Sequence, residues 1–87
     1  MIGLRLRGEG LEWREIDGEI VALETHGSVY LNVNRSGAFL WQALAAGATR
    51  ESLVSGLAER FALDPERAEV DVDTFLASLR TRGLLEG

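Results

Sequence analysis

The chain has 87 residues, enough for one domain, and its composition of 46% apolar and 26% charged residues favours a folded core over disorder. Fourteen acidic residues against nine arginines give a net charge of −5, which disfavours the broad basic surface that nucleic-acid binding needs. No apolar run approaches the length of about 18 residues that a membrane span needs, and there is no cysteine. These features predict a cytoplasmic protein with no membrane segment, signal peptide or disulfide.

The first third of the chain is typical of β-strands. Residues 11–16 contain alternating apolar and polar side chains, Asp17-Gly18 is a favoured two-residue hairpin turn, and residues 19–24 form the returning strand. Residues 28–33 alternate in the same way and predict a third strand. The pattern therefore indicates a three-stranded antiparallel meander. Residues 2–7 also alternate, which predicts a further strand or an arm.

After the third strand the apolar period changes to that of a helix. Ser36 is the candidate N-cap of a first helix over about 36–46, and Gly47 is placed to end it. Thr49 then caps a second helix that reaches about Ala62. A short link between these two helices makes them neighbours in space.

The third helix has the clearest start and stop signals. Asp64 precedes Pro65 at the first helical position, and Gly83 follows the predicted span of about 65–82. The stripe expected to face the core consists of Ala68, Val72, Phe75, Leu76 and Leu79. A neighbouring stripe is less polar than solvation alone requires, and consists of Val70, Asp73, Thr74 and Ala77.

The predicted order of elements is an α+β fold in which a three-stranded antiparallel sheet precedes three helices. Residues 1–10 are expected to form an N-terminal arm or extra strand, and residues 11–86 the domain proper. Dimerisation through an open strand edge stays possible, so we expect a monomer or a weak dimer.

The side chains that enzymes use are scarce. His26 is the single histidine, and its place beside Gly27 is typical of a solvated turn. The acidic residues of the third helix spread over several faces, which favours capping and solubility over a metal site. The sequence therefore predicts no catalytic residue, no metal, no cofactor and no enzyme activity.

Several segments together resemble the PqqD family over about residues 11–86. The most specific are the segment 34–38, Asn-Arg-Ser-Gly-Ala, which opens helix one, and the late segment 79–85, Leu-Arg-Thr-Arg-Gly-Leu-Leu. The resemblance implies a winged helix-turn-helix-like fold that recognises the leader peptides of ribosomally made, post-translationally modified peptides. A stand-alone chain of this size is similar to the leader-binding proteins of lasso-peptide clusters, which work beside a leader peptidase and a cyclase. It is also similar to the chaperone of pyrroloquinoline quinone synthesis.

The residues themselves offer a place for such a peptide. The segment 28–33 has neither proline nor charge, so its free edge is a candidate for an added strand, with helix three as the other wall. The predicted leader-binding residues are Ser28, Val29, Tyr30, Leu31, Asn32 and Val33 on the strand, and Val70, Asp73, Thr74 and Ala77 on the helix. A winged-helix DNA-binding protein and another protein-interaction role are the alternatives. The acidic first half of helix three disfavours the DNA alternative.

Overall fold

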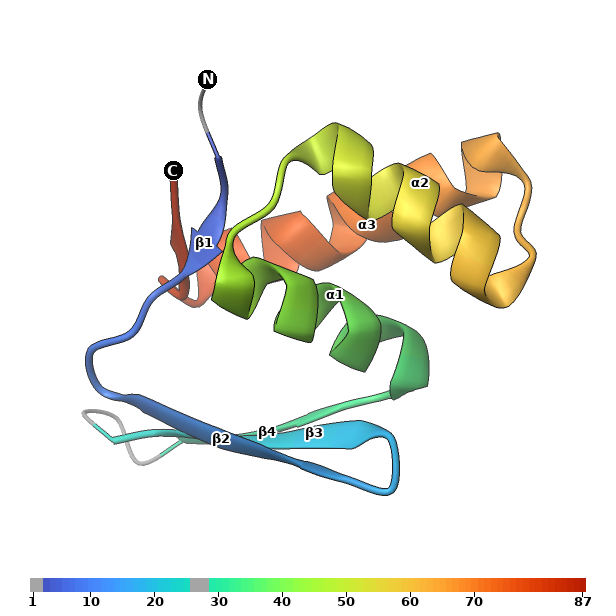
Figure 1. Ribbon diagram of the computed structural model, residues 1–87. Helices are drawn as coiled ribbons and strands as arrows, with labels where there is room; N and C mark the ends of the chain where they lie inside the picture. Colours follow the sequence, from blue (N-terminus) through green and yellow to red (C-terminus); the bar gives the residue numbers. More distant parts are fainter. Residues whose placement is uncertain (1–2, 26–28) are drawn as a thin grey trace.

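The computed structural model describes residues 3–25 and 29–87 (Figure 1). Strands β2 (Leu11–Ile16), β3 (Glu19–Glu24) and β4 (Val29–Val33) form an antiparallel sheet in the order β2-β3-β4. The predicted meander is therefore confirmed. The predicted turn at His26-Gly27 and the predicted strand residue Ser28 lie outside the described residues.

The hairpin between β2 and β3 forms for the predicted reason. Asp17 and Gly18 have φ angles of 54° and 81°, as a type I′ turn requires. Ile16 pairs with Glu19 directly across this turn. This pairing fixes the register of β2 against β3.

Three helices follow the sheet, as predicted: α1 (Arg35–Ala46), α2 (Arg50–Phe61) and α3 (Pro65–Thr81). The predicted N-cap of α1 was wrong. Asn34, not Ser36, caps this helix, because the Asn34 side chain accepts a hydrogen bond of 2.9 Å from the N–H of Gly37. Thr49 caps α2 as predicted, in a capping box with Ser52.

The helices cover one face of the sheet (Figure 1). Helix α1 lies directly on the sheet, and α2 and α3 pack on the side of α1 that is farther from the strands. Ile20 and Ala22 of β3 are buried beneath α1, and Trp41 and Leu44 of α1 have no exposed surface. Helix α1 is thus the centre of the core, and its two flanks are left to form surface features.

The two ends of the described chain come together at one side of the molecule (Figure 1). Strand β1 (Arg5–Leu6) pairs with β5 (Leu85–Glu86), and Leu4 forms a bridge with Ala48. The N-terminal segment therefore contains a strand, and this strand pairs with the C-terminus, not with the outer edge of β4. Within the described residues, no helix is long and apolar enough to cross a membrane.

Candidate functional site

The outer edge of β4 presents backbone groups that no described strand uses. A two-residue hairpin turn closes on a hydrogen-bonded pair, here Ile16 and Glu19, and such pairs recur at every second residue. The hydrogen bond of 2.8 Å from the N–H of Thr25 to the carbonyl of Gly10 continues this alternation beyond β2 and β3. The intervening residues of β3 therefore direct their backbone groups to β4.

The same alternation determines which groups of β4 are free. Ile20, Ala22 and Glu24 of β3 face β4, and their partners are Val33, Leu31 and Val29, respectively. The N–H and C=O groups of the two remaining central residues, Tyr30 and Asn32, therefore point to the open edge. An incoming strand would find two donors and two acceptors there.

The sheet has a second edge at β2, but the two edges differ in charge. Strand β2 contains Glu12, Arg14 and Glu15, whereas β4 contains no charged residue. Charged side chains on an edge strand discourage pairing with another strand, and their absence permits it. The edge of β4 is therefore the better template for strand addition.

Beside this edge lies a hollow of about 240 Å³ between β4, the start of α1 and the second half of α3. Five apolar side chains line it, Leu31, Val33, Trp41, Phe75 and Leu79, together with Asn32, Asn34, Gly37, Ser78 and Arg82. Leu31 and Val33 lie on the face of the sheet that holds the buried Ile20 and Ala22, because paired residues share a face. Side chains of an added strand that point to this face would enter the hollow.

Gly37 lines the hollow where β4, α1 and α3 meet. A Cβ atom at this position would overlap Cγ1 of Val33 and would lie 3.2 Å from Cε1 of Phe75. The glycine therefore permits β4, α1 and α3 to approach one another at this point. The Asn34 cap holds the same turn in place through the Gly37 N–H.

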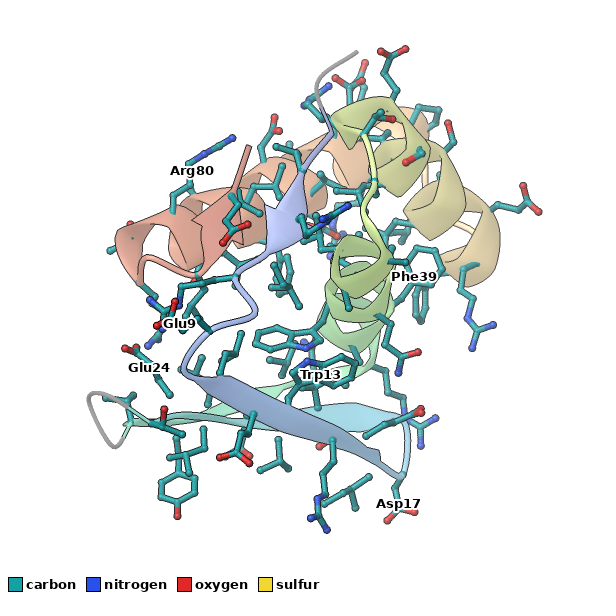
Figure 2. The ribbon with its side chains drawn as sticks, turned by 60° about the vertical axis from the view of Figure 1, so that its left-hand side comes forward. Glu9, Trp13, Asp17, Glu24, Phe39 and Arg80 are labelled. Atoms are coloured by element: carbon teal, nitrogen blue, oxygen red, sulfur yellow. The ribbon has the colours of Figure 1, made fainter. Side chains whose placement is uncertain are left out.

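The direction of α3 along the hollow follows from Arg7. Its guanidinium donates to the carbonyl of Gly83, just after α3, at 3.1 Å and pairs with Glu24 at 3.3 Å. Glu24 stands opposite Val29, the first residue of β4. Phe75 thus lies near the Val33 end of β4. The end of α3 lies near the Val29 end, on the side of Glu24 (Figure 2).

The structure brings the predicted residues Leu31, Asn32 and Val33 to the hollow, and leaves Val29 and Tyr30 exposed on the strand beside it. Ser28 lies outside the described residues. The predicted helix residues are not brought there. The part of α3 that lines the hollow consists of Phe75, Ser78, Leu79 and Arg82, and the lining includes none of Val70, Asp73, Thr74 and Ala77.

Asp73 shows why the predicted stripe points elsewhere. Its carboxylate accepts hydrogen bonds of 2.8 and 2.9 Å from the guanidinium of Arg50 on α2. The hydrogen bond from Arg50 lowers the pKa of Asp73, and the same bond raises the pKa of Arg50. The Asp73 border of the stripe therefore contacts α2, whereas Val70, Thr74 and Ala77 are exposed on the side of α3 away from the core. The sheet-facing side lies on the opposite flank of the core stripe.

A larger hollow of about 410 Å³ lies on the other flank of α1, between the hairpin tip, α1 and α2. Phe39, labelled in Figure 2, and Phe61 line it and pack edge to face, with ring centres 6.3 Å apart. It adjoins the charged strand β2, so the smaller hollow beside β4 is the better site for an extended peptide. No cluster of three or more His, Cys, Asp or Glu side chains that could hold a metal ion occurs among residues 3–25 and 29–87.

Comparison with known proteins assigns the fold and the family. The family model of coenzyme PQQ synthesis protein D (PqqD) matches residues 19–85. A structure of TbiB1 in complex with the TbiA(beta) leader peptide superposes with a TM-score of 0.86, at 26% identity, over 95% of each chain. Lasso peptide synthetase B1 complexed with the leader peptide superposes with a TM-score of 0.83, at 23% identity, over 97% of this chain and 98% of the other. No curated protein matches the sequence.

Proposed function

The chain belongs to the PqqD family, and from this premise we propose that it recognises the leader peptide of a ribosomally made precursor by adding the leader to β4 as a further strand. The observation that supports this most directly is the uncharged open edge of β4 beside an apolar hollow. Backbone hydrogen bonds to such an edge give affinity, and pockets for alternate side chains give specificity. The two similar solved structures are complexes with leader peptides, which supports the same role.

The proposed role is binding without catalysis. The leader, held along β4 and α3, would be presented to a leader peptidase and then to a cyclase or another modifying enzyme. We place the encounter in the cytoplasm, where the precursor is translated. We expect a monomer or a weak dimer, and a β4 edge occupied by a leader cannot at the same time pair with the β4 edge of a second copy.

Lasso-peptide biosynthesis is the proposed setting, since the second solved structure is a lasso peptide synthetase component. The other setting is coenzyme PQQ synthesis, which the family description names, and there the chain would act as a chaperone in the processing of the pyrroloquinoline quinone precursor. The neighbouring reading frames discriminate between them. A short precursor beside a peptidase and an asparagine-synthetase-like cyclase supports the lasso setting, and a radical enzyme supports the other.

Titration calorimetry tests the proposal. The leader segment of the precursor encoded beside this chain should bind with a dissociation constant in the nanomolar to micromolar range, about −12 to −8 kcal/mol. The core segment of the same precursor should not bind. Equal affinity for both segments contradicts the proposal. Tight binding of random duplex DNA in a fluorescence-anisotropy titration supports the winged-helix DNA-binding alternative instead.

A further inference from the structure

The hollow beside β4 has an arginine at one end, although the chain as a whole has a net charge of −5. Its lining contains one basic residue, Arg82, and no acidic residue. Among the described residues, no carboxylate pairs with the Arg82 guanidinium, whereas Arg7 at the same end is paired with Glu24. Arg82 is thus available to a charge that the ligand supplies.

The positions of the lining residues define a register. Phe75 faces Val33 across Gly37, and Leu79 follows one helical turn later, about 6 Å farther along α3. Successive side chains on one face of a strand are separated by about 6.7 Å, so two alternate residues of an added strand fit these two positions. Val33 and Leu31, which also line the hollow, have the same spacing on β4.

Arg82 comes next along α3. Its Cα lies about 4.5 Å beyond that of Leu79 along the helix, and the following same-face residue of the added strand lies about 6.7 Å beyond the second. Over both steps the strand advances about 13.4 Å and the helix about 10.5 Å, and the long and flexible arginine side chain spans the difference of about 3 Å. The third alternate position of the strand therefore meets a guanidinium where the first two meet apolar side chains.

On the basis of the proposed function, we infer that the bound leader presents two apolar side chains and then an aspartate or glutamate at alternate positions, and that this carboxylate pairs with Arg82. The apolar pair occupies the space lined by Phe75, Leu79, Leu31 and Val33. The carboxylate lies at the Val29 end of β4, where Val29 and Arg82 are exposed and an ion pair needs little desolvation.

An arginine in the last turn of a helix also has a purely structural role, because it compensates the negative end of the helix dipole. Arg80 separates the two roles. It lies in the same turn of α3 and has the same charge, but it does not line the hollow, and it projects from the side of α3 that faces away from the sheet (Figure 2). Arg80→Glu is therefore the matched control for Arg82→Glu.

The test is a charge-reversal titration followed by fluorescence anisotropy. The probes are the labelled leader segment of the precursor encoded beside this chain, and a set of peptides in which each acidic residue of that segment is replaced in turn by arginine. We expect Arg82→Glu to weaken binding of the unmodified leader by about 5- to 50-fold, as reversal of a partly exposed interfacial charge does. Arg80→Glu should change it by less than about twofold, as is usual for an exposed charge without a partner in the complex.

One arginine-substituted peptide should bind the Arg82→Glu protein more tightly than it binds the wild-type protein. The residue substituted in this peptide should lie two positions before or two positions after a pair of apolar residues that are themselves two positions apart. The inference is overturned if no substituted peptide recovers binding, if Arg80→Glu and Arg82→Glu have equal effects, or if the leader has no acidic residue in that pattern. Failure of the proposed function gives a different result, because the unmodified leader would then not bind the wild-type protein at all.

Discussion

Proline substitution at two adjacent positions of β4 separates strand addition from every other mode of leader binding. The N–H of Asn32 points to the open edge, whereas the N–H of Leu31 points to Ala22 of β3. Asn32→Pro therefore removes a donor that the folded protein does not use. Proline also favours an extended conformation in the residue before it, which a strand already has. Leu31→Pro removes a hydrogen bond within the sheet.

The magnitudes follow from the hydrogen bonds. In the complex, Asn32→Pro leaves one leader carbonyl beside the apolar hollow without its donor, at a cost of about 1–3 kcal/mol, or about 5- to 150-fold in affinity. The unbound protein should keep its circular dichroism spectrum and most of its thermal stability. Leu31→Pro should lower stability itself, because it removes a sheet hydrogen bond and strains the pairing with β3.

Asn32→Ala is the control, because it removes the exposed side chain of Asn32 and keeps its N–H. We expect this variant to bind the leader within about threefold of the wild type, as for most surface substitutions. Affinity is measured by calorimetry with the leader segment, and folding by circular dichroism. An Asn32→Pro protein that is folded and binds the leader at full strength refutes strand addition at β4.

Three further predictions concern the hollow and the helices around it. Gly37→Ala forces Val33 and Phe75 apart, so it should lower the free energy of unfolding by about 1–3 kcal/mol and also weaken leader binding. Gly56→Ala crowds Phe39 on the other flank of α1, so it should lower the melting temperature and leave leader binding unchanged; equal leader affinity of the two variants argues against the hollow as the binding site. Ser78→Arg fills the hollow and should weaken leader binding by about 1–3 kcal/mol, whereas Ala77 is adjacent on α3 but lies outside the hollow, so Ala77→Arg should have little effect. If calorimetry finds that Ala77→Arg weakens binding more than Ser78→Arg, the leader binds at the stripe of α3 predicted from the sequence. The hydrogen bond from Arg50 lowers the pKa of Asp73 from 3.8, so this pairing stabilises the fold above pH 3.8 and the stabilisation is lost as the pH falls through the lowered pKa of the folded protein. The melting temperatures of the wild type and Asp73→Asn should therefore differ at neutral pH and converge in acid; a difference that persists in acid contradicts this assignment.

The sheet and the helices were predictable because local signals determine them. The Asp17-Gly18 turn, the Thr49 cap and the Pro65 start each specify backbone geometry within a few residues, and all three occur as predicted. The cap of α1 was missed because Asn34 and Ser36 are both good N-caps. Which of the two caps the helix depends on where the chain leaves β4, and this is determined by tertiary contacts that the local sequence does not specify.

The binding face of α3 was not predictable from periodicity. The core stripe was identified correctly, since Ala68, Val72, Leu76 and Leu79 are buried. Periodicity does not tell which flank of that stripe faces the sheet, because this depends on how α3 crosses α1 and α2. Two signals pointed to the correct flank: the large apolar Phe75 at its border, and the ability of Asp73 to pair with Arg50 on the other side. The pairing of β1 with β5 was missed because it joins the two ends of the chain.

Amide hydrogen exchange of β4, followed by nuclear magnetic resonance with and without the leader segment, tests strand addition most directly. In the free protein, the N–H groups of Leu31 and Val33 are bonded to β3 and should exchange slowly, whereas those of Tyr30 and Asn32 point to the open edge and should exchange fast. The leader should slow exchange at Tyr30 and Asn32 and change Leu31 and Val33 little. If the bound leader leaves Tyr30 and Asn32 in fast exchange and protects amides of α2 instead, the leader does not add to β4.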